Sequence, residues 1–173
     1  SILYNNHQYN SMYITLAGCD CSGKSSIIRK LDQPNFIILK EPYFPENIEL
    51  LKTHHDINET ISIFARDRAA LYKLIPPNSN IISDRSIICN YVYQSLQLHQ
   101  YALSDAIKYI QSFQASYIPR IDHAFYIYAS PNTLTKRCNK RNEEMNMSKA
   151  KALNERYLQV LQHLQIPYTP LNT

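Results

Sequence analysis

Glycine is nearly missing from this chain, with two glycines among 173 residues where an average protein has roughly 7%. Long hydrophobic runs are missing too: no apolar stretch approaches the ~20 residues that span a bilayer, so no membrane association is expected. The chain is not predicted to be disordered, because 45% of its residues are hydrophobic and 18% are charged. A chain of this length is expected to form one domain that buries roughly two-thirds of its unfolded surface.

A strong charge of either sign is also absent. The formal net charge is +4, from 18 lysines and arginines against 14 acidic residues, and the basic residues are scattered except near residues 137–141. Nucleic-acid-binding proteins usually carry a basic stripe, so DNA is not favoured as a partner. A mild positive charge suits a small, phosphate-rich ligand equally well.

Cysteine is scarce and shows no paired metal-binding spacing. No secretory leader precedes the cysteines, so we expect reduced, mostly buried thiols and a cytoplasmic location, or the host cytoplasm if the protein is viral. The four cysteines are Cys19, Cys21, Cys89 and Cys138.

Short apolar strands alternate with helical stretches along most of the chain, and no repeat is found. Residues 1–11 are polar and aperiodic and predict a flexible N-terminal arm or an expression-derived remnant, followed by a single domain over residues 12–173. Alternation of this kind predicts a three-layer α/β/α fold with a five-stranded parallel sheet, whose ligands lie at the carboxyl ends of the strands. We expect strands at 13–17, 36–39, 81–84, 123–129 and 168–171, and helices at 24–31, 57–74, 87–98, 104–117 (N-capped by Ser104), 131–141 and 149–164.

The turn after the first predicted strand matches the phosphate-binding pattern G-x-x-x-x-G-K-[ST], and both glycines of the chain occupy its two glycine positions. Such a turn wraps backbone N–H groups around the phosphates of ATP, while the lysine reaches the β- and γ-phosphates and the serine hydroxyl ligates Mg²⁺. The alternative is a plain strand-to-helix turn. The predicted phosphate-binding residues are Gly18, Cys19, Asp20, Cys21, Ser22, Gly23, Lys24, Ser25 and Ser26.

A carboxylate, Asp84, ends the third predicted strand in the sequence Ile-Ile-Ser-Asp-Arg. A carboxylate beside a phosphate-binding loop commonly holds Mg²⁺ and its waters, so Asp84 and Ser25 are the predicted metal ligands. The alternative for Asp84 is that it caps the helix that follows.

Four ordered segments between about residues 12 and 171 resemble the thymidylate kinase family of P-loop nucleoside monophosphate kinases. The segments are the loop with Asp20, Lys40-Glu41-Pro42, Phe64-Ala65-Arg66-Asp67-Arg68, and Asp84-Arg85-Ser86 followed by Asn90, Tyr93 and Gln94. Each match is short, but the four together at these spacings are fairly specific. The resemblance implies a P-loop NTPase fold with ATP and a pyrimidine deoxynucleotide as ligands.

The resemblance also implies a set of acceptor-binding roles. Asp20 would contact the sugar 3′-hydroxyl, Phe64 would stack on thymine, and Tyr93 would pack against the sugar. Arg68 and Arg85 would hold the acceptor phosphate, and Asn90 and Gln94 would face the edge of the base. The implied acceptor residues are Asp20, Lys40, Glu41, Phe64, Arg68, Arg85, Asn90, Tyr93 and Gln94.

From the residues alone, these positions have simpler interpretations. Phe64 and Tyr93 fit core packing, residues 67–68 fit a solvated helix face, and Lys40 fits an exposed charge that closes a strand.

A basic cluster precedes a polar segment where members of the family have a mobile lid, expected here at about residues 137–148. The lid arginines of the family close over the phosphates, and this P-loop carries no arginine of its own. Arg137 and Arg141 are therefore the candidates for stabilising charge on the transferring group. The alternative is that they stabilise a helix C-terminus.

The chain departs from the family pattern at several positions. Lys40 replaces an arginine, Tyr43-Phe44-Pro45 replaces a small, glycine-rich continuation, and Ser86 replaces a tyrosine. The expected lid carries Glu143-Glu144-Met145-Asn146 where many members have an Asp-Arg pair. These departures bear on the acceptor and on the homodimer common in the family, for which the sequence shows no interface signature.

The sequence thus predicts transfer of the ATP γ-phosphoryl group to dTMP, giving dTDP, with Mg²⁺ as cofactor. The predicted catalytic residues are Lys24, Asp84, Arg85, Arg137 and Arg141. One alternative is a deoxynucleoside kinase that uses Glu41 as a general base. Others are a kinase of a modified pyrimidine such as 5-hydroxymethyluracil, as a nucleotide or in DNA, and a nucleotide-binding module without catalysis.

Overall fold

The computed structural model describes residues 11–53, 55–114 and 118–173. Residues 1–10 of the predicted arm and residues 115–117 of the predicted helix 104–117 lie outside the described part of the chain. The described strands form one five-stranded parallel sheet in the order β2-β3-β1-β4-β5, which confirms the predicted fold class. The strands are β1 (Tyr13–Ala17), β2 (Phe36–Lys40), β3 (Asn80–Asp84), β4 (His123–Tyr128) and β5 (Tyr168–Asn172).

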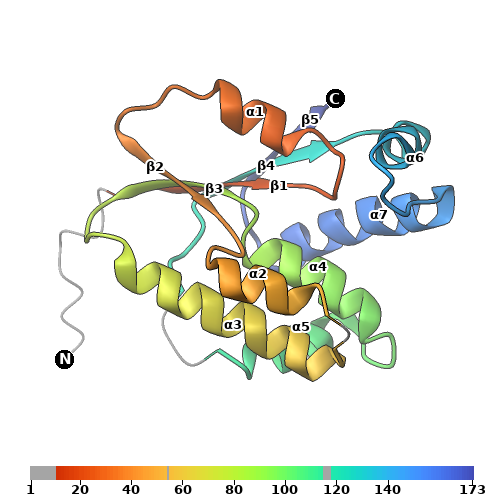
Figure 1. Cartoon of the computed structure of the whole chain (residues 1–173), viewed down its shortest axis with the longest axis horizontal. Helices are drawn as coiled ribbons and strands as arrows, with labels where there is room; N and C mark the ends of the chain where they lie inside the picture. The colour runs from red at the N-terminus through yellow and green to blue at the C-terminus, as the bar shows by residue number, and fades with distance from the viewer. Residues whose placement is uncertain (1–10, 54, 115–117) are drawn as a thin grey trace.

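Helices cover both faces of this sheet, with α1 on one face and α3, α4, α5 and α7 on the other (Figure 1). Apolar residues at helical spacing explain this packing: Ile88 and Val92 of α4 and Leu161 of α7 are fully buried. The helices are α1 (Lys24–Lys30), α2 (Pro45–Leu51), α3 (Ile57–Leu74), α4 (Ile87–Gln97), α5 (Leu103–Gln111), α6 (Pro131–Lys140) and α7 (Met147–His163).

Strand register brings the ends of the inner strands together. Asp84 at the end of β3 pairs with Leu16 of β1 on one side and with Lys40 of β2 on the other. Ala17, which ends β1, pairs with Tyr126 of β4. The turn that follows β1 therefore emerges beside Asp84, as the parallel arrangement predicts.

Several helices differ from the predicted ones, most of all at the end of α5, which lies at Gln111 and not at residue 117. Helix α2 was not predicted; it begins at Pro45, because proline suits the first helical position. The prediction that Ser104 caps α5 is wrong, since Ala102 has the extended cap conformation and places Ser104 inside the first turn. Helix α7 begins earlier than predicted, because the Asn146 side chain accepts a hydrogen bond from the Lys149 N–H and caps it. Among the described helices, none combines the length and the apolarity needed to cross a membrane.

The start of α2 is held by a buried carboxylate on α3. Asp67 is 1% exposed and accepts hydrogen bonds from the backbone N–H groups of Tyr43 (2.7 Å) and Phe44 (2.9 Å) and from the Asn47 amide (2.9 Å). The interpretation of Asp67 as part of a solvated helix face is therefore wrong. Buried donors that lose their acceptor are costly, so this carboxylate fixes the path of the chain after β2.

We expect Asp67→Ala to lower the free energy of unfolding by about 2–3 kcal/mol, because it leaves three donors unpaired. The neighbouring, exposed Arg66 provides the control: Arg66→Ala should change stability by less than about 0.5 kcal/mol. Urea unfolding of both variants measures the difference. Equal stability of the two would contradict a structural role for Asp67.

Candidate active site

The two glycines of the phosphate-binding turn are required by its backbone. Gly18 has φ +156°, and a Cβ placed on it would lie 2.2 Å from the backbone oxygen of Ile127. Gly23 has φ +107° and stands at the N-cap of α1, a conformation that residues with side chains rarely adopt. The turn therefore packs so closely against β4 that only a residue without a Cβ fits at position 18.

Lys24 lies inside this turn. Its ammonium Nζ donates hydrogen bonds to the backbone oxygens of Gly18 (2.5 Å) and Cys19 (2.7 Å) and to Ser22 Oγ (3.3 Å). Burial and the nearby Arg85 guanidinium lower the pKa of Lys24. An anion in the turn would offset both effects, so the position suits a lysine that binds phosphate.

Two tyrosines from distant helices brace the turn. The Tyr157 hydroxyl on α7 donates to the Gly18 oxygen (2.8 Å), and the Tyr93 hydroxyl on α4 accepts from the Asp20 N–H (3.1 Å). The two rings meet edge to face, with centroids 6.5 Å apart. Tyr157 was not predicted as a site residue, and no local pattern in the sequence distinguishes it from other helical core residues.

Asp20 links the turn to the end of β3. Its carboxylate forms an ion pair with the Arg85 guanidinium. Burial opposes the charge on Asp20, but Arg85 and Lys24 outweigh it and hold the pKa of that carboxyl below its usual value. Arg85 has φ +72°, an uncommon backbone conformation for a non-glycine residue and one often found at functional sites.

The structure separates the two interpretations of Asp84. Helix α4 is capped by Ser86, whose side chain accepts from the Ile88 N–H (3.3 Å), so the interpretation of Asp84 as a cap is wrong. The Asp84 side chain is buried, and its Oδ1 has no hydrogen-bond partner within the described residues. Asp84 pairs with Leu16 of β1, and the turn after β1 leads to the exposed Ser25 at the start of α1. A buried carboxylate oxygen without a partner in the described residues, together with such a hydroxyl, fits a set of ligands for a hard cation such as Mg²⁺.

A cavity of about 260 Å³ opens next to Asp20 and Arg85. All the implied acceptor residues line it except Lys40 and Arg68. Its lining residues are Asp20, Glu41, Pro42, Thr60, Phe64, Arg85, Ser86, Cys89, Asn90, Tyr93, Gln94 and Gln97.

The cavity wall contains amide atoms that no protein group satisfies. Asn90 Oδ1 and both amide atoms of Gln94 are buried and have no hydrogen-bond partner in the described part of the chain. An unpaired buried polar atom costs about 1–3 kcal/mol, so such atoms tend to mark a ligand. The interpretation of Phe64 and Tyr93 as simple core is incomplete, because both are half-buried and face this cavity.

Lys40 and Arg68 lie elsewhere. Lys40 is exposed at the end of β2, as the simpler interpretation expected. Arg68 is 3% exposed, and its Nε donates to Glu41 Oε2 (3.4 Å), whereas the Tyr72 hydroxyl donates to Glu41 Oε1 (2.8 Å). Burial raises the pKa of Glu41, against the opposing attraction of Arg68. Arg68 thus reaches the cavity only through Glu41, although its Nη2 is buried and has no hydrogen-bond partner among the described residues.

The two arginines near the end of α6 differ in position. Arg137 Nη1 donates to the backbone oxygens of Cys21 and Ser22 (both 3.4 Å) and to Thr173 Oγ1 (2.9 Å), so its guanidinium lies against the phosphate-binding turn. Arg141 is exposed and is the C-cap of α6, where a positive charge stabilises the helix end. The structure brings Arg137, and not Arg141, to the turn.

Half of the expected lid is helical. Its first residues belong to α6 and its last to α7, which leaves a connection at residues 141–146. The connection is anchored: Met145 is buried, and the Glu143 N–H donates to the Cys138 oxygen (2.9 Å). The Cys21 thiol of the turn donates to Glu143 Oε2 (3.4 Å), and burial together with Cys138 and Glu143 raises the pKa of that thiol to about 12. All four cysteines are free and buried, as predicted.

Comparison with known proteins agrees with this geometry. A family model described as an AAA domain matches residues 13–173. A probable thymidylate kinase of Methanosarcina acetivorans is 28% identical over 156 residues, covering 81% of this chain and 75% of the relative. One from Methanococcoides burtonii is 28% identical over 163 residues, covering 85% and 81%. The thymidylate kinase of Nautilia profundicola is 36% identical over 93 residues, covering 47% and 48%.

Solved structures show the same fold. Thymidylate kinase from Candida albicans superposes with a TM-score of 0.73 at 17% identity, covering 94% of this chain and 84% of that one. Deoxyadenosine kinase from M. mycoides with bound dATP gives 0.67 at 21% identity, covering 93% and 91%. The chain therefore belongs to the AAA-domain family of P-loop proteins, and the predicted resemblance to thymidylate kinases is confirmed by relatives that match most of its length.

Proposed function

We propose that this protein is a nucleoside monophosphate kinase that transfers the γ-phosphoryl group of ATP to dTMP, giving dTDP. The observation that carries the proposal is a single carboxylate, Asp20, which belongs both to the phosphate-binding turn and to the wall of the neighbouring cavity. A donor in the turn and an acceptor in the cavity would meet at that residue. The relatives named thymidylate kinase and the deoxyadenosine kinase structure support nucleotide kinase activity in general.

Along α4 the cavity lining changes from a charged end to an amide end, because Arg85 precedes the helix and Asn90 and Gln94 lie about one and two turns into it. Arg85 lies at the charged end, and a guanidinium suits a phosphate because it can donate two parallel hydrogen bonds. Asn90 and Gln94 provide unpaired amide atoms that match the donor and acceptor edge of a pyrimidine, and Phe64 provides an aromatic face. A deoxynucleoside monophosphate has the same order of groups, from phosphate to base.

Catalysis in this arrangement depends on positioning and charge. Lys24 and the N–H groups of the turn would hold the β- and γ-phosphates, and Arg85 would exchange its ion pair with Asp20 for the acceptor phosphate. The acceptor phosphate is ionised at neutral pH, so no general base is required. Ser25 and Asp84 would hold Mg²⁺, which neutralises negative charge on the phosphates. Arg137 is placed to approach the transferring group; Arg141 would do so only if the connection at residues 141–146 moved.

A deoxynucleoside kinase is the second candidate, because one such enzyme shares the fold. That chemistry needs a free carboxylate to take a proton from a hydroxyl. Both carboxylate oxygens of Glu41 are already engaged, by Arg68 and by Tyr72. This arrangement favours the monophosphate acceptor over the nucleoside.

The direct test is an ADP-release assay across the nucleoside and deoxynucleoside monophosphates, run beside thymidine and deoxyadenosine. We expect dTMP to give the highest kcat/KM. Phosphorylation of a nucleoside with no transfer to any monophosphate would instead establish the second candidate. A preference for 5-hydroxymethyl-dUMP or for DNA containing that base would establish the modified-pyrimidine alternative.

We expect Lys24→Ala to lower kcat about 10²- to 10³-fold, because it removes a preorganised charge from the transferring phosphates. Lys30→Ala, at an exposed lysine on the same helix, removes the same charge and should leave kcat unchanged. Circular dichroism of both variants confirms that they are folded. Full turnover by a folded Lys24→Ala protein would refute the assignment of the turn.

Gln94→Met tests the amide end of the cavity, because methionine keeps the volume but removes two unpaired polar atoms. We expect kcat/KM for the acceptor to fall, by a factor that corresponds to a loss of about 1–3 kcal/mol of transition-state stabilisation. The KM for ATP should not change, and the melting temperature should be equal or higher. Gln111→Met, at an exposed glutamine on α5, is the control. A loss of stability without a loss of acceptor efficiency would show that Gln94 is structural.

A further inference from the structure

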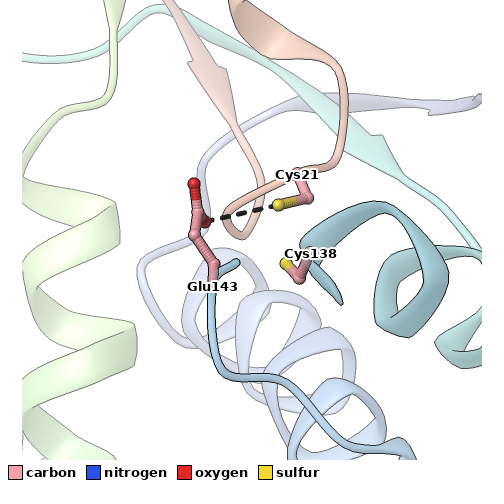
Figure 2. A group of neighbouring side chains, drawn as sticks. All are labelled: Cys21, Cys138 and Glu143. Atoms are coloured by element: carbon pink, nitrogen blue, oxygen red, sulfur yellow. Dashed lines mark hydrogen bonds between the residues drawn. The ribbon is translucent and has the colours of Figure 1, made fainter. Parts of the chain in front are cut away.

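Three potential metal ligands meet where the phosphate-binding turn touches the end of α6. They are Cys21 of the turn, Cys138 of α6 and Glu143 of the connection between α6 and α7, and their ligand atoms all lie within 4.8 Å of one another. Figure 2 shows the three side chains converging from these separate segments, with the Cys21 sulfur hydrogen-bonded to the Glu143 carboxylate. None of the three lines the acceptor cavity, and the proposed phosphoryl transfer uses none of their side chains, since Cys21 takes part in the phosphate-binding turn only through its backbone N–H.

The backbone directs these side chains toward one another. Cys21 has φ +66°, which is uncommon for a residue with a side chain. Cys138 is 1% exposed, and its thiol lies 3.8 Å from the Asp20 oxygen of the same turn. The Glu143 N–H is bonded to the Cys138 oxygen (2.9 Å), which fixes the spacing of these two ligands. The fold therefore holds the two buried cysteines in place, and the Glu143 backbone is fixed to Cys138 although its side chain is exposed.

Two sulfur ligands and one carboxylate suit a borderline-soft cation, whereas Mg²⁺ prefers oxygen ligands. In a tetrahedral zinc site, with bonds of about 2.3 Å to sulfur, ligand sulfurs lie roughly 3.8 Å apart. The three ligand atoms lie at most 4.8 Å apart, so the two sulfurs exceed that value by no more than about 1 Å, a change that side-chain rotation supplies. Glu143 is exposed, so water has access to the fourth position.

Charge also favours a dication here. Two thiolates and a carboxylate carry three negative charges, so a bound divalent cation reduces the net charge of the cluster to one negative charge. The Arg137 guanidinium, which donates to the Cys21 oxygen at 3.4 Å, lies beside the cluster and offsets the remainder. Metal binding must displace the thiol protons, so the affinity of the cluster for the cation should rise with pH.

We propose that Cys21, Cys138 and Glu143 form a binding site for a thiophilic divalent cation such as Zn²⁺. The cation would join the phosphate-binding turn to the connection at residues 141–146, two segments that the thiol hydrogen bond from Cys21 to Glu143 already links in the described structure. This site is separate from the predicted Mg²⁺ ligands Ser25 and Asp84 and does not depend on the proposed kinase activity.

The test is a Co²⁺ titration of the full chain, without nucleotide and with a phosphine reductant present. Co²⁺ bound by thiolates gives a charge-transfer absorption in the near ultraviolet, and Zn²⁺ should displace it at one equivalent per chain. Excess Mg²⁺ should not. Cys138→Ser should abolish the absorption or weaken binding about tenfold or more, since it removes a fixed thiolate ligand. Cys89→Ala, which removes a buried thiol outside the cluster, should bind as the unchanged protein does.

Glu143→Gln examines the carboxylate, because it keeps both thiols and the side-chain size. We expect it to retain the charge-transfer absorption with a weaker affinity for Co²⁺, and an unchanged affinity would remove Glu143 from the ligand set. The proposal as a whole is overturned if the unchanged protein gives no thiolate absorption, or if Cys138→Ser gives the same titration as the unchanged protein. Since the readout is metal binding, failure here would leave the proposed phosphoryl transfer intact.

Discussion

The contact between Gly18 and the backbone oxygen of Ile127 sets the position of the whole site. A Cβ at Gly18 would lie 2.2 Å from that oxygen, so the turn can follow β4 only with glycine there. The Gly18 carbonyl is in turn the acceptor for both Lys24 and the Tyr157 hydroxyl. A residue without a side chain therefore connects the sheet, the phosphate-binding lysine and helix α7 at one point.

From that point the site extends through Asp20. Its N–H is bonded to Tyr93, and its carboxylate is paired with Arg85, whose backbone is in the left-handed region. Arg85 is positioned by β3, which lies next to β1 in the sheet. Asp20 and Arg85 each favour the charged form of the other, so both remain charged. Asp20 thereby positions a charged guanidinium that can bind a phosphate.

Two kinds of buried polar group coexist around this site, and they serve different ends. Asp67 accepts three hydrogen bonds, so its burial stabilises the fold. Asp84 Oδ1, Asn90 Oδ1 and the Gln94 amide have no partners in the described residues, so their burial is unfavourable for the protein alone. Most of this unfavourable burial lies where ligands are expected, as is usual at functional sites, and the exception is Arg68 Nη2, which is buried behind Glu41.

The sequence by itself determined the elements whose signals are local: the strand β1, the loop that follows it, the long amphipathic α3 and the alternation that implies a parallel sheet. Tertiary structure alone decided which residues meet across the chain, because contacts between distant segments leave no periodic signal. Helix α2 depends on Asp67 more than 20 positions later, and the group formed by Cys21, Cys138 and Glu143 depends on α6 packing against the turn. Arg68 matched the family pattern, yet it is buried against Glu41 and does not line the cavity. Arg141 was expected in the lid, yet it is exposed at the end of α6 and does not line the cavity either.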